Sequence, residues 1–242
     1  LKEDERIMEN FCKYPVEVKL NSEFYLIPAK SSFLMSDLKE IGSLVEACKH
    51  KEKFNCIVMD PPWENKSVRR GKKYDWLSLE DIKTIPLPDL AAPECLVVIW
   101  VTNKLKILNF VKEILFPFWS VEFITKWYWV KTTKFGKPIF PFENLHKKPY
   151  ETMIIGKFSP KHKMDQASDS DIKELVICSV PCSIHSHKPP LEAVLKRYAN
   201  LSKDAKCLEL FARSLVPHWT SWGNEVLKLQ NTSYFVKLAI YF

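Results

Sequence analysis

A short apolar run that ends in Asp60-Pro61-Pro62-Trp63 constrains the fold of this chain more than any other feature. The run, Phe54–Met59, is rich in apolar and β-branched residues, which is typical of a central strand in a parallel sheet. Prolines donate no N–H to a ladder, so the strand ends there and the proline carbonyls are expected to stay as unpaired acceptors. Open α/β sheets bind ligands at the carboxyl ends of their strands. The sequence therefore predicts a carboxylate, a rigid carbonyl and an aromatic ring at one ligand-binding edge.

These three groups suit the methylation of an exocyclic amine on a flat base. Such an amine is a poor nucleophile because its lone pair is delocalised into the ring. The Asp60 carboxylate and the Pro61 carbonyl can accept its two N–H hydrogens and stabilise the positive charge that develops on nitrogen. Trp63 is expected to hold the base by its π-face. The alternative is a strand that happens to end in this tetrapeptide before a turn.

Asp-Pro-Pro-Trp is also the signature of a known family, which this sequence resembles over roughly residues 20–230. The family contains the adenine-N6 methyltransferases related to the catalytic subunit of the messenger-RNA adenosine methyltransferase. Further segments that carry the resemblance, in family order, are 100–102, 129–132, 147–151, 185–190, 208–213 and 219–225. Ser-Val-Pro-Cys followed by His-Ser-His-Lys-Pro-Pro, together with Trp-Thr-Ser-Trp-Gly-Asn-Glu, is most similar to the branch called methyltransferase-like protein 4.

The resemblance implies an α/β fold of the Rossmann-like type that S-adenosylmethionine-dependent methyltransferases use. We expect a mostly parallel central sheet with helices on both faces, and a permuted order in which the catalytic strand precedes the cofactor strand. The expected organisation is a peripheral segment, 1–20, and one catalytic domain, 21–242. S-adenosylmethionine is the implied cofactor. No metal is expected, because Cys178 and Cys182, with His185 and His187, lack the spacing of a paired Cys-x-x-Cys site.

The resemblance also assigns roles to individual residues. The implied catalytic residues are Asp60, Pro61, Pro62 and Trp63. The implied cofactor-binding residues are Ser36, Asp37, Leu38, Asp60, Lys188, Arg213, Asn224 and Glu225. The expected substrate-binding residues are Trp63, Lys66, Arg69, Arg70, Trp100, Trp129, Lys131 and Glu151.

Several of these residues have simpler explanations that the sequence leaves open. Asp37 precedes an apolar stripe at helical spacing and is equally well explained as a helix cap. Trp100 and Trp129 lie near strand ends, where they can line a base pocket or pack in the core. The basic segment 64–74 is either a clamp on a phosphate backbone or a solvated loop.

Periodicity and turn signals predict the remaining elements. Expected strands cover 24–28, 95–101, 121–132, 152–158, 175–178, 206–211 and 234–242. Expected helices cover 2–14, 38–48 and 103–115, with two short ones after Ser78 and at Pro189-Pro190. The loop 133–149 combines lysines with Phe135, Phe140 and Phe142, a composition suited to stacking and phosphate contact. The chain has five glycines and none in the turn that directly follows strand 206–211, so no glycine-rich dinucleotide fingerprint is present.

Composition and charge indicate the class of partner. The chain carries 36 Lys and Arg against 29 Asp and Glu, and the resulting net charge of +7 favours a polyanion. No apolar run approaches the length of a membrane span, so no membrane partner is expected. The seven scattered cysteines are typical of buried intracellular thiols. Because the chain begins at Leu1, we expect it to be part of a longer protein.

The resemblance makes nucleic acid the expected partner, with RNA favoured over DNA. Its branch is associated with N6-methylation of a 2′-O-methylated adenosine in small nuclear RNA, and DNA adenine is the alternative substrate. The domain is expected to act as a monomer in the nucleus, with the cytosol or mitochondrion as alternatives. A catalytically inactive nucleic-acid-binding scaffold is the alternative from another functional class.

Overall fold

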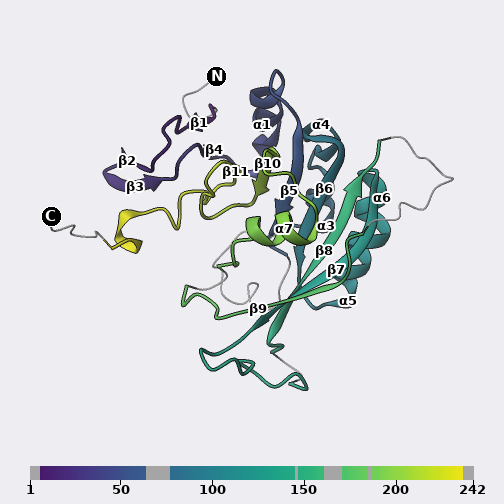
Figure 1. The fold of residues 1–242 in the computed structure, drawn as a ribbon. Coiled ribbons are helices and arrows are strands. Elements are labelled where there is room, and N and C mark those ends of the chain that lie inside the picture. The colour runs from purple at the N-terminus through teal and green to yellow at the C-terminus, as the bar shows by residue number, and fades with distance from the viewer. Residues whose placement is uncertain (1–5, 64–76, 145–146, 161–170, 185–186, 237–242) are drawn as a thin grey trace. The chain divides into compact units, whose positions relative to one another are not determined.

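The computed structural model describes residues 6–63, 77–144, 147–160, 171–184 and 187–236 (Figure 1). These residues belong to two units, one made of 1–52 with 206–242 and one made of 53–205. We call them the first unit and the second unit. Within the two units, and leaving aside one hairpin, four of the seven described strand pairings are parallel. The expected α/β fold with a mostly parallel sheet and helices is thus confirmed.

The second unit is built on strands in the order β5-β6-β8-β7-β9. Their bounds are β5 Phe54–Met59, β6 Ala91–Val101, β8 Tyr150–Phe158, β7 Val121–Lys131 and β9 Leu175–Ser179. β5 runs parallel to β6, and β9 runs parallel to β7. β8 lies between β6 and β7 and is antiparallel to both, with Val101 opposite Thr152 and Trp129 opposite Glu151. The start of β8 therefore lies at the edge where its neighbours end.

Local sequence signals explain the helices of the second unit. These are α3 Leu79–Lys83, α4 Leu87–Leu90, α5 Leu105–Asn109, the π-helical η3 Phe110–Leu115, α6 Phe116–Phe118 and α7 Glu192–Tyr198. The expected capping box opens α3, because the Ser78 hydroxyl accepts from the Asp81 N–H and the Asp81 carboxylate accepts from the Ser78 N–H. Gly156 in β8 allows α6 to approach closely, since a Cβ there would lie 2.5 Å from a ring carbon of Phe116.

The first unit has a smaller sheet in the order β1-β4-β11-β10. The strands are β1 Met8–Glu9, β4 Ser32–Leu34, β11 Thr220–Trp222 and β10 Cys207–Leu210. β4, β11 and β10 are mutually parallel neighbours, whereas β1 is antiparallel to β4. The helical segments are η2 Leu38–Glu40, α1 Ile41–Cys48 and η4 Thr232–Tyr234. The residues that follow β4, β11 and β10 consequently share one edge of this sheet.

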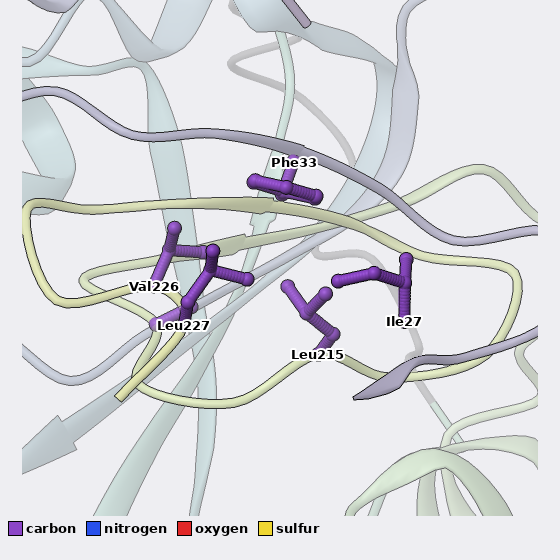
Figure 2. Packing of buried hydrophobic residues seen from close by; sticks show 6 residues of the cluster. Ile27, Phe33, Leu215, Val226 and Leu227 are labelled. Carbon is purple, nitrogen blue, oxygen red and sulfur yellow. The ribbon is translucent and has the colours of Figure 1, made fainter. Parts of the chain in front are cut away.

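A hairpin closes the apolar core of the first unit. β2 Val16–Leu20 pairs with β3 Glu23–Ile27, and the partly buried Val16, Val18, Leu20 and Tyr25 pack against a buried cluster. The cluster consists of Ile27, Phe33, Ala212, Leu215, Val226 and Leu227 (Figure 2). Residues from both ends of the sequence thus bury their apolar surface together.

Three local expectations are wrong within the described residues. No helix forms over 6–14, because the amide of buried Asn10 donates to the carbonyls of Tyr14, Ile27 and Pro28 and its oxygen accepts from the Cys12 N–H. These side-chain bonds favour a turn over a helix. α7 begins at Glu192, after both prolines, rather than with a proline in its first turn. Residues 234–236 are not a strand, since the 3₁₀ turn η4 ends at Tyr234.

None of the helices in the described ranges has the length and apolar character that crossing a membrane would require.

Candidate active site

Four charged side chains meet at the edge of the second unit where β5 and β7 end and β8 begins. Asp60 follows β5, Lys131 ends β7, Glu151 is the second residue of β8, and Lys188 precedes α7. The Lys188 ammonium lies 2.9 Å from Asp60 Oδ2 and 2.9 Å from Glu151 Oε2. The other oxygen of Glu151 lies 2.5 Å from the Lys131 ammonium. We call this row, Asp60, Lys188, Glu151 and Lys131, the ion-pair chain.

Partial burial and mutual attraction set the charges of the ion-pair chain. Burial alone would raise the pKa of the Glu151 carboxyl, but the ammonium groups of Lys188 and Lys131 outweigh burial and lower that pKa below its ordinary value. Burial alone would lower the pKa of Lys188, but Asp60 and Glu151 outweigh it and raise that pKa. Lys188 and Glu151 therefore stay charged at neutral pH, and the chain pairs two cations with two carboxylates.

Two buried tryptophans lie against the lysines of the ion-pair chain. Trp100 and Trp129 are only 3% and 2% exposed, and their rings meet edge to face at 6.0 Å between centroids. The Lys188 ammonium lies 5.3 Å from the Trp100 ring, and the Lys131 ammonium lies 4.8 Å from the Trp129 ring. Both tryptophans are thus core residues that also stabilise the cations through their π-faces. Of the two explanations open from sequence, the structure favours packing.

The Asp-Pro-Pro-Trp segment forms a tight turn in which both proline carbonyls accept hydrogen bonds. Trp63 N–H donates to the Pro61 carbonyl at 2.8 Å, and Leu77 N–H donates to the Pro62 carbonyl at 3.3 Å. The expectation of unpaired carbonyls is therefore wrong, because the chain turns sharply enough for Trp63 to reach back. A carbonyl oxygen has two lone pairs, so Pro61 retains capacity for a second donor.

Trp63 is buried rather than exposed as a surface on which a base could stack. Its side chain belongs to the core at 7% exposure, and its indole N–H donates to the Trp100 carbonyl at 2.7 Å. This bond joins the end of β5 to the end of β6. Trp63 therefore fixes the position of Asp60, while base stacking by its ring stays a prediction.

Asn103 and Ser179 are structural partners of the site that the sequence analysis did not single out. The Asn103 amide donates to the Tyr150 carbonyl at 3.0 Å, and its oxygen accepts from the Thr152 hydroxyl at 3.1 Å. Asn103 thus forms hydrogen bonds with the residues on both sides of Glu151. Ser179 accepts from the Trp129 indole N–H at 2.7 Å. Asn103 lies just past the end of strand β6, so the strand-end argument used for Asp60 applies to it as well.

Asn103→Ala is expected to lower the free energy of unfolding by about 1 kcal/mol, because two hydrogen bonds at a partly exposed position are lost. Urea denaturation measures this change. Asn103→Asp is the matched control, since a carboxylate still accepts from the Thr152 hydroxyl but cannot donate to the Tyr150 carbonyl. We expect an intermediate loss for this control. Wild-type stability of Asn103→Ala would show that the β8 ladder alone holds Glu151.

The first unit gathers most of the expected cofactor-binding residues at one strand edge. Ser36, Asp37 and Leu38 follow β4, whereas Asn224 and Glu225 follow β11. The buried Ser36 hydroxyl accepts from the Trp222 indole N–H at 2.8 Å, which joins the two strand ends. Asp37 caps η2 by accepting from the Lys39 N–H at 2.8 Å. The cap explanation for Asp37 is therefore confirmed, and a ligand role remains compatible with it.

The turn after β10, which leads to Arg213, is built without glycine. Phe211 takes the left-handed conformation that glycine usually supplies, with a φ of 60°. Its ring packs on Trp222 at 5.6 Å between centroids, and the Ala212 N–H donates to the Trp222 carbonyl at 2.9 Å. Gly223 allows the backbone after β11 to approach the turn after β10 closely, because a Cβ there would lie 3.1 Å from the Ala212 carbonyl oxygen. Aromatic packing and one glycine replace the glycine-rich turn of dinucleotide-binding folds.

A scan against family models matches residues 54–225 to MT-A70. The chain belongs to the MT-A70 family. The match begins with β5 and ends at Glu225, so it contains every expected site residue except Ser36, Asp37 and Leu38. This confirms the resemblance that the Asp-Pro-Pro-Trp motif indicated.

Named relatives place the chain with the METTL4 branch of the MT-A70 family. It is 48% identical to the human protein called N(6)-adenine-specific methyltransferase METTL4, over 96% of this chain and 49% of that protein. It is 35% identical to the Caenorhabditis elegans DNA N6-methyl methyltransferase, over 92% of this chain and 58% of that one. It is 32% identical to the Pyricularia oryzae N6-methyladenosine RNA methyltransferase MTA1, over 88% of this chain and 57% of that protein. The chain thus spans about half the length of these relatives.

Some expected site features lie outside the described residues, namely Lys66, Arg69 and Arg70 of the basic segment, and His185. Across the part of the chain that the structure describes, no three His, Cys, Asp or Glu side chains form a group that could hold a metal ion.

Proposed function

We propose that this MT-A70 chain is the catalytic domain of an S-adenosylmethionine-dependent methyltransferase that acts on the N6 amine of adenine in nucleic acid. The observation that carries the proposal is the position of Asp60. Its carboxylate sits at the carboxyl end of β5 and is paired with Lys188, which also pairs with Glu151. The named relatives support the same reaction, since all three are called N6-adenine or N6-methyl methyltransferases.

In this proposal Asp60 acts as the acceptor for the target amine. A carboxylate has about four lone-pair sites, so an ion pair with Lys188 does not prevent Asp60 from accepting an amine N–H. The carbonyl of Pro61, with its second lone pair, accepts the other N–H. Both acceptors stabilise the positive charge that nitrogen develops as it gains the methyl group. The proton leaves afterwards, so no side chain has to act as a base beforehand.

Lys188 and Glu151 hold the Asp60 carboxylate in position. The Lys188 ammonium pairs with the Asp60 carboxylate, and Glu151 orients that ammonium through a second ion pair. The family resemblance further assigns Lys188 to the carboxylate of the cofactor. Positioning and electrostatic stabilisation, rather than acid–base chemistry, are then the main sources of the rate.

The first unit carries side chains whose chemistry fits S-adenosylmethionine. A ribose diol needs hydrogen-bond acceptors, which the Glu225 carboxylate and the Asn224 amide supply from the same strand end. Ser36, Asp37 and Leu38 are proposed to flank the adenine, and Arg213 completes the set. When bound, the cofactor supplies an electrophilic sulfonium methyl group.

For the substrate we propose RNA, in particular a 2′-O-methylated adenosine of a small nuclear RNA. DNA adenine is the second candidate, because one relative is named for DNA and another for RNA. The proposal places the enzyme in the nucleus, with the domain acting as a monomer. A target adenine must be unstacked, so a single-stranded or terminal nucleotide is favoured over one inside a duplex.

A side-by-side methyl-transfer assay tests the substrate. Three matched oligonucleotides, each with one adenine, are incubated with the protein and labelled cofactor: RNA with a free 2′-hydroxyl on the adenosine, RNA with a 2′-O-methyl group there, and DNA. We expect transfer to the 2′-O-methylated RNA to be fastest, by about tenfold or more over matched DNA, because a hydrogen-bonded or packed ribose substituent is worth roughly 1–3 kcal/mol. Equal or faster transfer to DNA contradicts the RNA assignment. No transfer and no cofactor binding contradict the enzyme assignment itself.

A further inference from the structure

The connection between β7 and β8, residues 132–149, carries exposed aromatic rings and an excess of lysines that packing of the fold does not explain. We call it the β7–β8 loop. It projects past the ends of its two strands in Figure 1. Two phenylalanines are left in solvent, Phe135 at 79% exposure and Phe142 at 47%. The segment 133–149 carries four lysines and one glutamate, an excess of three positive charges.

Hydrogen bonds among the described residues of the loop, 132–144 and 147–149, hold its base and its first turn. At the base, Lys131 N–H donates to the Pro149 carbonyl at 2.7 Å and Ile139 N–H donates to the Lys131 carbonyl at 3.0 Å. In the first turn after β7, Gly136 N–H donates to the Thr133 carbonyl at 2.9 Å, and Gly136 has the positive φ of 77° that favours glycine. Phe135 is thus presented at the corner of a tight turn.

Two rings of the loop, the exposed Phe135 and the half-buried Phe140, lie beside cationic groups. The Lys134 ammonium is 5.1 Å from the Phe135 ring, and the Lys147 ammonium is 5.7 Å from the Phe140 ring. Lys148 donates to the Phe142 carbonyl at 2.9 Å, which holds another ammonium at the backbone of the loop. Aromatic faces alternating with positive charges are what a single strand of nucleic acid needs for stacked bases and a phosphate backbone.

The β7–β8 loop starts and ends next to the ion-pair chain, because Lys131 ends β7 before it and Glu151 follows the first residue of β8 after it. Phe142 stacks on Tyr150 at 6.3 Å, and Tyr150 meets Tyr128 edge to face at 6.0 Å. Tyr150 directly precedes Glu151, and its carbonyl is held by Asn103. Side chains alternate along β8, so these rings lie on the face of the sheet opposite Glu151, and they hold the loop at the strand end where the ion-pair chain lies. Nucleotides bound by the loop would therefore lie next to one that reaches Asp60.

We propose that the β7–β8 loop binds the single-stranded nucleic acid next to the target adenine, with Phe135 and Phe142 stacking on flanking bases and the lysines contacting phosphates. This inference rests on the proposed function, because it assigns a surface to the substrate of that reaction. Charge complementarity favours nucleic acid over a protein partner, since the described cations of the loop outnumber its acidic residue.

Fluorescence anisotropy with a labelled single-stranded RNA tests the proposal without requiring turnover. Phe135→Ala with Phe142→Ala is expected to weaken binding by about tenfold or more, since base stacking on a ring is lost at two places. Affinity for the matched blunt duplex should be weaker than for the single strand in the wild type. Cofactor affinity, measured by calorimetry, should not change.

Phe118→Ala is the matched control in the same unit. Its ring is 60% exposed and lies 5.3 Å from the Lys83 ammonium, so it resembles Phe135 in exposure and in its cation, but it lies on α6. RNA affinity should be unchanged in this control. Phe135→Ala alone removes a ring that is almost fully solvated, so its fold is expected to be intact by circular dichroism.

Salt dependence separates the phosphate contacts from the stacking. Lys134→Gln with Lys137→Gln should reduce the slope of log affinity against log salt by about 0.7 per lysine. Wild-type affinity in the double phenylalanine variant overturns the inference. Loop-dependent RNA binding by a protein that transfers no methyl group supports the inference and overturns only the proposed function.

Discussion

Asp60→Ala should abolish methyl transfer, with a fall in kcat of about 10³-fold or more. Removing one group that stabilises charge in a transition state typically costs 10²–10³ in rate, and Asp60 also accepts and orients the amine. Single-turnover assays with saturating cofactor and an adenine-containing oligonucleotide measure the loss. Cofactor affinity by calorimetry should change far less than the rate, because the proposed ribose and adenine contacts come from other residues.

Two further variants make the Asp60 result specific. Asp60→Asn preserves the shape but places amide hydrogens toward the amine, so it should be about as inactive as Asp60→Ala. Asp89→Asn removes an exposed carboxylate from α4 of the same unit and should retain full activity. Substantial turnover by Asp60→Ala would reject the assignment of Asp60, whatever the family of the chain.

Lys188→Met should destabilise the protein, because it leaves Asp60 and Glu151 facing each other without their shared cation. Removing one partner of a buried pair costs about 3–5 kcal/mol. Asp60 and Glu151 retain 18% and 28% exposure, and Lys131 still pairs with Glu151. We therefore expect the free energy of unfolding to fall by about 2–3 kcal/mol. Urea denaturation at pH 7 measures the loss. The same variant should also bind the cofactor more weakly.

The stability lost in Lys188→Met should depend on pH. Glu151 has a lowered pKa when folded, so its contribution is present above the ordinary value of 4.5 and disappears as pH falls through the folded pKa. Lys188 has a raised pKa, so its contribution is present below 10.5 and disappears as pH rises through the folded pKa. The difference between wild type and variant should therefore be constant between about pH 5 and pH 10 and shrink outside that window.

Lys196→Met provides the control for the Lys188 prediction. Lys196 pairs with Glu192 one helical turn away in α7, and both side chains are about one-third exposed. Such an exposed pair contributes only about 0.3–0.5 kcal/mol. A loss for Lys188→Met no larger than this control would show that the ion-pair chain does not stabilise the folded protein.

The parts of the site that depend on one strand could be predicted from the sequence. The apolar Phe54–Met59 run is β5, and Asp60 follows it as the prolines require. The capping box at Ser78 and the cap at Asp37 were equally predictable, because a cap depends only on residues within one turn. The family signature was confirmed over residues 54–225.

Features that depend on the pairing of distant strands could not be predicted. The antiparallel direction of β8 decides that Glu151 meets Lys188 and Lys131, and no local pattern specifies that direction. The burial of Trp63 follows from its bond to the Trp100 carbonyl, which only the β5–β6 register supplies. Asn10 likewise prevents a helix by bonding to carbonyls as far away as Pro28.

The reversed strand β8 also determines where the length of this sequence can change. Glu151 faces the ion-pair chain because of its place in the alternation of β8, and one extra residue after it would turn the following side chains to the opposite face. Residues added before Tyr150 only enlarge a surface loop and leave that alternation intact. Insertions and deletions in this loop can therefore remodel the surface beside the ion-pair chain without disturbing the register that places Glu151 against Lys188.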